Sequence, residues 1–213
     1  AEGTPEKNIV FRGDRTDRMF DYLPYDLVSG QWNGIRFHSS SYENVMNFTD
    51  VHSTFNGIVC DSSDVSRLKL KFYNSIVHNC QGYGLRSVNS VVDVRNSQLT
   101  NTLNDCVAIY GGGALLLNCT IAQFYPFDSN RGAALRFSNG ENDGEALHKY
   151  PLYKMDCVNS IVTGYADDVV MGSVADSTIS YTYKFQNCIL RTDSIDNGAV
   201  SYTHLTLPTN REV

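Results

Sequence analysis

Short segments in which hydrophobic and polar residues alternate recur along the whole chain. They are clearest at residues 68–72, 92–95, 153–157 and 183–185. A period of two places successive side chains on opposite faces, which is typical of β-strands with one buried face. Tyr, Asn, Ser, Val and Thr are frequent, Pro is scarce, and no long helical periodicity is present. The pattern therefore predicts an all-β protein.

An asparagine lies at a fixed place in each repeat of this pattern. The repeat asparagines are Asn74, Asn96, Asn118, Asn159 and Asn187. The first three lie 22 residues apart, and Leu85 and Val107, eleven residues before the second and third, keep the same interval. The later copies follow at intervals of 41 and 28 residues. Equal spacing at two points of one unit indicates a stacked solenoid, because each turn has to superpose on the last.

Each repeat contains three candidate strands: the first starts near a glycine, the second precedes the asparagine and the third follows it. The alternation turns a set of first-strand side chains inward: Ile35, Phe37, Ile58, Cys60, Leu85, Val107, Ile109, Leu135, Val169 and Met171. The third strands contribute Val77, Leu99, Ile121, Val162 and Leu190. In the second strands, Tyr153 is expected to point inward and Lys69 outward. Lys71 is expected to pair with Asp93 of the next turn.

Three short strands per turn predict a right-handed, single-stranded parallel β-helix of about six turns, spanning residues 1–199 and truncated at both ends. Asparagine suits its corners because it accepts a left-handed backbone conformation and its amide can bond the asparagines above and below. Asn96→Ala is therefore expected to cost on the order of 1 kcal/mol. The alternative architecture is a β-sandwich, which would not need phasing at 22 residues.

Three segments depart from the repeat. Residues 12–31 and 138–151 are interpreted as loop insertions. The aromatic residues at 20–25 suit a sugar-binding surface, or they fold the first insertion back onto the body. Residues 200–213 look like translated sequencing adapter and are interpreted as a non-native or disordered tail, with a genuine capping segment as the alternative.

The cysteines and histidines show no metal-binding spacing. The cysteines are Cys60, Cys80, Cys106, Cys119, Cys157 and Cys188. None forms a Cys-x-x-Cys pair, so we interpret them as small core residues and predict no metal site. His52 and His78 stand at matching places in two repeats, which indicates a structural role at a corner.

The charge and hydrophobicity of the chain argue against a nucleic-acid partner and against a membrane span. The 213 residues carry a formal net charge of −6 and no basic run, so no nucleic-acid partner is predicted. No stretch of about 18 apolar residues occurs, and no transmembrane segment is therefore predicted. The chain begins at Ala1 without a recognisable signal peptide, as expected if its true start is missing.

The phrase Trp32-x-Gly34-Ile35-x-Phe37, together with the Asn-Ser and Asn-Cys corners, resembles the right-handed β-helix repeat proteins of bacterial cell surfaces and secretions, which have a pectate-lyase-like fold. The likeness covers residues 8–198. It implies export from the cell and association with polysaccharides. This fold carries lyases, glycosidases, adhesins and structural shafts, so the resemblance does not specify an activity.

The outer side of the first strands holds the candidate ligand-binding residues. They are Arg36, His38, Asp61, Arg86, Tyr110 and Arg136. Three arginines on one face of an acidic protein could hold a polyanionic sugar through its carboxylates. The alternative is that this face is exposed to solvent and binds no ligand.

For a catalytic site, the sequence lacks some of the residues that the chemistry requires. A pectate-lyase-like site needs several aspartates to hold Ca²⁺, and the predicted face offers a single acid. A polygalacturonase-like site needs two or three carboxylates, for which Asp105, Asp167 and Asp168 are the candidates, but the Gly-His-Gly and Arg-Ile-Lys phrases are absent. Oxygen ligands at 139–145 are better explained as a solvated turn, so no cofactor is predicted and Ca²⁺ lacks a ligand cluster.

The leading hypothesis is an exported or cell-surface protein that binds polysaccharide or serves as a scaffold without catalysis. One alternative is a polysaccharide lyase or glycoside hydrolase acting on acidic glycans. Another is an adhesin or structural shaft that recognises a protein.

Overall fold

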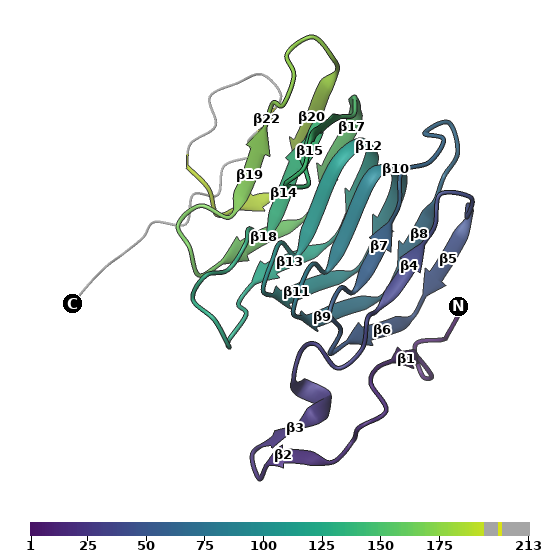
Figure 1. The fold of residues 1–213 in the computed structure, drawn as a ribbon, viewed down its shortest axis with the longest axis vertical. Helices are drawn as coiled ribbons and strands as arrows, with labels where there is room; N and C mark the ends of the chain where they lie inside the picture. The colour runs from purple at the N-terminus through teal and green to yellow at the C-terminus, as the bar shows by residue number, and fades with distance from the viewer. Residues whose placement is uncertain (194–199, 202–213) are drawn as a thin grey trace, which may run out of the picture.

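The computed structural model describes residues 1–193 and 200–201 (Figure 1). The described chain is all-β apart from one short 3-10 helix, η1 (Tyr25–Leu27). Its two large sheets consist of parallel strands, and the chain advances along them from the N-terminus to the C-terminus, as the colour gradient in Figure 1 shows. The prediction of an all-β protein is confirmed.

One sheet has seven strands, all parallel. We call it the third face; in order, its strands are β1 (Ile9–Phe11), β6 (Thr49–His52), β9 (Ile76–Cys80), β11 (Gln98–Thr102), β13 (Thr120–Gln123), β18 (Ile161–Gly164) and β21 (Ile189–Leu190). Neighbours in this sheet are successive copies of one strand of the repeat, as stacking predicts.

The other large sheet has eleven strands and consists of two faces that share its two longest strands, β10 (Leu85–Arg95) and β12 (Val107–Leu117). The first halves of β10 and β12 form the first face with β4 (Ile35–Phe37), β7 (Ile58–Cys60), β14 (Leu135–Ser138) and β19 (Val170–Ser173). Their second halves form the second face with β5 (Asn44–Asn47), β8 (Leu70–Tyr73), β17 (Leu152–Val158), β20 (Tyr181–Gln186) and β22 (Val200–Ser201). The two halves of each long strand meet at positive φ, at Asn89 and at Gly111.

Within residues 1–193, the chain visits the three faces in the same order six times. The successive turns are β4–β5–β6, β7–β8–β9, β10–β11, β12–β13, β14–β17–β18 and β19–β20–β21. Each strand pairs with its equivalent one turn later, and the 22-residue interval appears directly in the register, where Leu85 pairs with Val107. This arrangement fits a β-solenoid.

The core runs between the faces and consists of the inward side chains of all three. Of the third-strand residues predicted to point inward, Val77, Leu99, Ile121 and Val162 are buried, while Leu190 in the last turn is partly exposed. All six cysteines are free thiols, of which five are buried and Cys188 is partly exposed. Burial raises the pKa of the Cys60, Cys80 and Cys106 thiols to about 12, so they remain protonated core residues.

The repeat asparagines occupy one corner of the stack. Asn96 Nδ2 donates to Asn74 Oδ1 at 3.1 Å, and Asn118 Nδ2 donates to Asn96 Oδ1 at the same distance. The column starts one turn earlier than predicted, because Asn74 Nδ2 donates to Asn47 Oδ1 at 2.8 Å. All five predicted asparagines have positive φ, between 49° and 54°. The two later ones, Asn159 and Asn187, thus share the corner conformation.

A second, buried column of hydroxyl groups lies beside the asparagines. Ser75 Oγ accepts from the backbone N–H of Thr49 at 2.9 Å, and Ser97 Oγ accepts from that of Ser75 at 3.1 Å. Ser160 Oγ likewise accepts from Cys119 N at 3.0 Å. These hydroxyls satisfy backbone donors at the corner, where the strand ladders are interrupted.

Two predicted inward side chains point outward. In β19, Val170 rather than Met171 pairs with the inward Leu135. The strand is therefore shifted by one residue from the predicted alignment, and Met171 is exposed. The prediction for Tyr153 was also wrong: an irregularity in the register of β17 leaves both Tyr153 and Lys154 on its outer side.

Lys69 was expected to point outward but is fully buried. It lies at the corner before β8, where strict alternation does not apply, and its Nζ donates to the carbonyls of His38 at 2.9 Å and Ser41 at 3.2 Å. Lys71 does lie opposite Asp93, as predicted. The carboxylate of Asp93, however, forms its ion pair with Arg95.

Both insertions contain short antiparallel hairpins. Residues 12–31 include β2 (Arg18–Phe20), β3 (Leu23–Pro24) and η1. The segment 138–151 includes β15 (Gly140–Asn142) and β16 (Leu147–Lys149). Of the predicted tail 200–213, the first two residues form β22 beside β20, and the remainder lies outside the described residues.

The asparagine column can be tested at Asn96, which both donates and accepts an amide bond. Asn96→Gly keeps the positive φ but removes both bonds, and we expect it to lower the free energy of unfolding by about 1 kcal/mol. Asn96→Ala adds the strain of a left-handed alanine to the loss of both bonds, which raises the cost expected from the sequence to about 2 kcal/mol. Urea denaturation measures both values, and an unchanged midpoint for both variants would contradict a stabilising column.

Candidate functional site

The three predicted arginines lie in one row across the outer side of the first face. In the register of the strands, Val59 lies between Arg36 and Arg86. Ala108 likewise lies between Arg86 and Arg136. Each arginine is therefore two strands from the next, or about 10 Å at the usual strand spacing. They share a row without touching one another.

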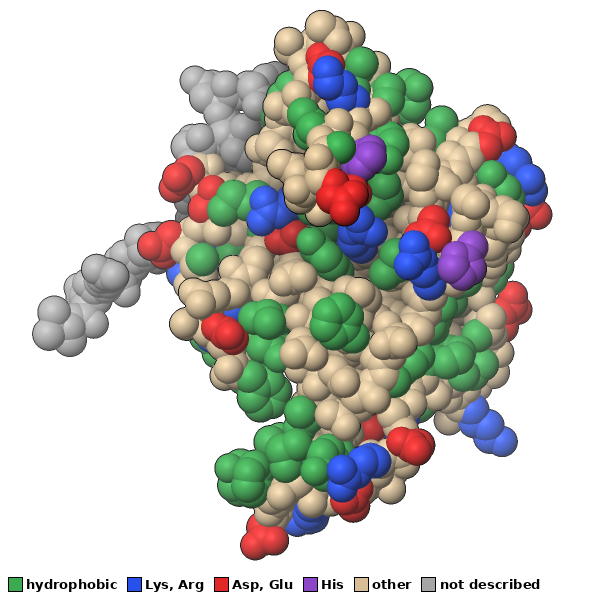
Figure 2. All heavy atoms as spheres, in the orientation of Figure 1, with side chains coloured by type: hydrophobic (Ala, Val, Ile, Leu, Met, Phe, Trp, Pro, Cys, Tyr) green, Lys and Arg blue, Asp and Glu red, His purple; other side chains and the backbone are tan. Residues whose placement is uncertain are grey.

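Each of these arginines is paired with a carboxylate of the protein. Arg36 Nε lies 2.9 Å from Asp61 Oδ1, and Arg136 Nε lies 2.7 Å from Asp105 Oδ2. Arg86 pairs with Glu141 of the β15–β16 hairpin. The expectation that this face offers a single acid was therefore wrong, because the insertion and the chain before β12 bring in two more. Figure 2 accordingly shows positive and negative side chains next to one another, with no large area of one sign.

The six predicted ligand-binding residues fall into two groups. Arg36, His38 and Asp61 form one group on the first two turns, with His38 Nδ1 at 3.2 Å from Asp61 Oδ2. Burial by itself would raise the pKa of Asp61, but hydrogen bonds and charge interactions with Arg36 and His38 outweigh it and lower that pKa. This group is an exposed ion-pair cluster.

The second group, Arg86, Tyr110 and Arg136, lies in or beside a cleft of about 480 Å³. The cleft is lined by Tyr83, Asn104, Asp105, Tyr110, Gly132, Arg136, Ser138, Gly140, Asn142, Leu147, Ser173 and Ala175. Its floor is the outer side of β12, β14 and β19, and the β15–β16 hairpin forms one wall. The second insertion thus turns an open sheet face into a concave site.

Two tyrosines flank the guanidinium group of Arg86. Its Cζ lies 5.9 Å from the ring centroids of both Tyr83 and Tyr110. Burial raises the pKa of the Tyr110 hydroxyl, and the neighbouring Tyr83 raises it further. The Tyr110 phenol is therefore neutral and can donate as well as accept hydrogen bonds.

Asp105 fixes the floor of the cleft. Its carboxylate is almost fully buried and accepts from the backbone N–H of Ala133 at 2.7 Å and from Arg136 Nε at 2.7 Å. The hydrogen bond to Asp105 raises the pKa of Arg136, against the opposing effect of burial. Asp105 thus holds Arg136 in place and links the segment before β12 to the following turn.

The other acidic candidates have local structural roles. Asp168 Oδ1 accepts from Val170 N and Thr192 Oγ1, and the fully exposed Asp167 pairs with Arg191. In the second insertion, Asp143 Oδ1 accepts from two backbone N–H groups of its own turn. The contacts of Asp143 match the solvated turn predicted for residues 139–145, whereas Asp167 and Asp168 contact residues of the following turn.

Sequence reasoning did not place Tyr83 or Glu141 at the site, and it named Asp105 only as a candidate catalytic carboxylate. Tyr83 and Asp105 lie 22 residues apart, so the repeat interval itself places them on adjacent turns of one sheet edge. Glu141 could not be found in this way, since the position of an inserted hairpin over a sheet has no periodic signal.

Comparison of the chain with protein-family models, with curated proteins and with solved structures found no match. Among the described residues, no helix is long and apolar enough to cross a membrane.

The pKa shift of Asp61 predicts a pH-dependent contribution to stability. Because its folded-state pKa is depressed, the stabilisation is complete above the ordinary carboxyl range and is lost as the pH falls through the folded-state value. We therefore expect Asp61→Asn to lower the free energy of unfolding by up to about 1 kcal/mol at neutral pH, and by nothing at low pH. Urea denaturation as a function of pH measures this difference.

Asp14→Asn is the matched control, because Asp14 takes part in none of the ion pairs of the described residues. A constant difference between wild type and Asp61→Asn at every pH would contradict the assigned ion pair.

Proposed function

We propose that this protein is a right-handed parallel β-helix that is exported or displayed on the cell surface and binds a carbohydrate, without catalysis, in the cleft on its first face. The handedness is supported by the strong preference of parallel strands in one sheet for right-handed connections. Six described turns that cross the three faces in one repeating order support the architecture.

The observation that carries the proposed function is the composition of the cleft. Its volume of about 480 Å³ is in the range of small-molecule sites. Tyr83 and Tyr110 offer aromatic surface and hydroxyl groups, while Asn104, Asn142 and Ser138 offer further donors and acceptors. A sugar presents hydroxyl groups around an apolar ring face, and this combination of side chains complements both.

The charges favour a neutral sugar over a polyanionic one. Every arginine of the row already has a protein carboxylate as its partner. A polyanion would have to displace Asp105 or Glu141, which would leave a carboxylate unpaired at the site. This proposal departs from the acidic glycan expected from counting arginines in the sequence.

The same pairing supports binding rather than cleavage. Glycoside hydrolysis uses two carboxyl groups that flank the scissile bond, one as an acid and one as a base or nucleophile. The two carboxylates at this cleft, Asp105 and Glu141, each bind an arginine, and Asp105 also binds a backbone N–H group. These carboxylate oxygens therefore have a structural role, because they hold the arginines and the backbone of the site in place.

A second candidate function, recognition of a protein, is favoured by the first insertion. Phe20 and Tyr22 stack with ring centroids 5.6 Å apart and are both exposed, Tyr22 to 81 %. Figure 2 shows hydrophobic atoms gathered over this β2–β3 segment, at the bottom of the view. Exposed aromatic groups of this kind are typical of protein contacts.

We expect neutral oligosaccharides to bind the cleft and Tyr83→Ala to weaken that binding about two- to tenfold, since an aromatic contact contributes about 0.5–1.5 kcal/mol. An array of neutral and acidic glycans, followed by titration calorimetry with the best ligand, measures the affinity. The same incubations are assayed for new reducing ends and unsaturated products.

Tyr165→Ala is the matched control, because Tyr165 is an exposed tyrosine that is not among the residues lining the cleft. Equal affinity of Tyr83→Ala and wild type would place the ligand elsewhere, and loss of binding in Tyr22→Ala would assign it to the first insertion. Released products would replace the binding function with hydrolysis or elimination.

A further inference from the structure

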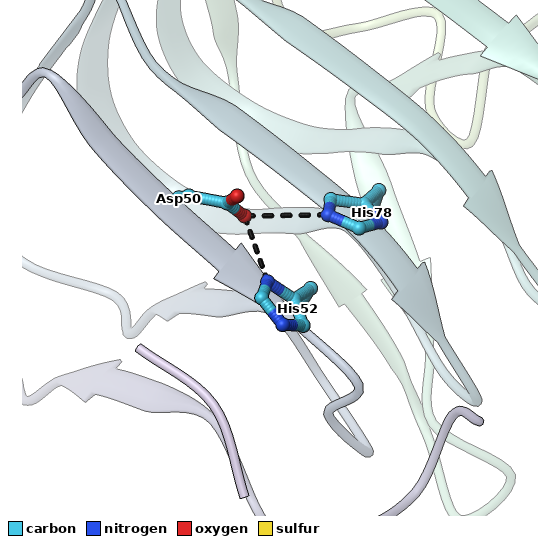
Figure 3. Close-up of side chains that lie close together, drawn as sticks. All are labelled: Asp50, His52 and His78. Carbon is cyan, nitrogen blue, oxygen red and sulfur yellow. Dashed lines mark hydrogen bonds and ion pairs between the residues drawn. The ribbon is translucent and has the colours of Figure 1, made fainter. Parts of the chain in front are cut away.

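Three side chains that sequence reasoning did not bring together converge on the outer side of the third face (Figure 3). Asp50 and His52 lie on β6, two residues apart and therefore on the same side of the strand. His78 lies on β9 as the direct cross-strand neighbour of His52. The histidines were expected at a corner after the third strand, and they lie within it. The sequence placed His52 and His78 at matching positions of two repeats, but it did not bring Asp50 beside them.

The ligand atoms of these residues point toward one another. Asp50 Oδ1 lies 2.8 Å from His52 Nδ1 and 3.3 Å from His78 Nε2. One ligand atom from each of the three residues lies within 4.8 Å of the other two. Ligands at the usual zinc distances of about 2.0–2.1 Å are separated by about 3.3 Å in a tetrahedral site, so small side-chain rotations suffice.

A fourth residue orients His52. Its Nε2 lies 3.1 Å from Asp26 Oδ1 in the first insertion, and Asp26 Oδ2 accepts from Arg12 at 2.7 Å. A proton held on Nε2 by Asp26 leaves the lone pair of Nδ1 for a cation. Such a carboxylate–histidine contact commonly accompanies metal-binding histidines.

The cluster is both firmly held and reachable. The side chain of His52 is 8 % exposed, whereas those of Asp50 and His78 are 21 % and 23 % exposed. The rings of His52 and His78 stack with centroids 4.8 Å apart, which limits their rotation. A cation can therefore reach ligands that are already in position.

We propose that Asp50, His52 and His78 bind a divalent transition-metal ion of the zinc class, with a fourth position open to water. Imidazole and carboxylate ligands suit Zn²⁺ and its neighbours better than they suit Ca²⁺. The ion links the first two turns through β6 and β9, and through Asp26 it also fastens the first insertion to them. The site lies on the third face and is separate from the proposed carbohydrate cleft on the first.

The test uses the full chain, dialysed against a chelator and titrated calorimetrically with ZnCl₂ at about pH 8, where free histidines are neutral. We expect one Zn²⁺ per chain and a higher melting temperature with the ion. His78→Gln should weaken binding at least tenfold. Asp26→Asn removes no proposed ligand but replaces the carboxylate that supports His52 and pairs with Arg12, and it should weaken binding about tenfold. His148→Gln is the control, because His148 pairs with Asp143 in the other insertion.

The absence of zinc binding by the wild-type chain, or equal affinity of His78→Gln and wild type, would overturn the proposal. Should His78→Gln fail to fold, the visible absorption of Co²⁺ on the wild-type chain decides instead. A spectrum of tetrahedral or five-coordinate cobalt supports the site, and one identical to aqueous Co²⁺ refutes it.

Discussion

Superposition of successive turns is the constraint on which the rest of this structure depends. A parallel strand can satisfy its backbone groups only through its neighbours in the stack, so every turn has to return to the same register. The chain meets this requirement at its corners. Asparagines there take the left-handed conformation and bond to one another, and buried serine hydroxyls accept backbone N–H groups. These contacts keep the strands in phase along both parallel sheets.

A stack held in phase on the inside leaves its outer surface free to vary. Inward positions carry Val, Leu, Ile and Cys in nearly every turn, whereas outward positions carry arginines, acids and tyrosines. The two insertions use this freedom differently. The β15–β16 hairpin covers the first face and creates a cleft, and the segment around η1 packs against the third face through Asp26. Both candidate sites thus combine a regular sheet with one irregular segment.

The two sites differ in how their charges are arranged. On the first face, arginines and carboxylates compensate one another in pairs. On the third face, two histidines share one carboxylate and a second carboxylate lies behind one of them. The first arrangement suits a neutral ligand that forms hydrogen bonds, and the second suits a small cation. Neither depends on the net charge of the chain.

The repeat interval and the alternation of side chains determined the all-β class, the order of the strands and most of the core, because stacking and burial impose periodic demands on the sequence. They also placed Arg36, Arg86 and Arg136 in one row. Periodicity failed where the backbone is irregular, at Lys69 in a corner, at Tyr153 beside an irregular register, and at Met171. Only the tertiary structure decided which acid each arginine meets and that Asp26 reaches His52. Those contacts depend on how an insertion folds back over a sheet, and the path of an insertion follows from packing rather than from any repeat.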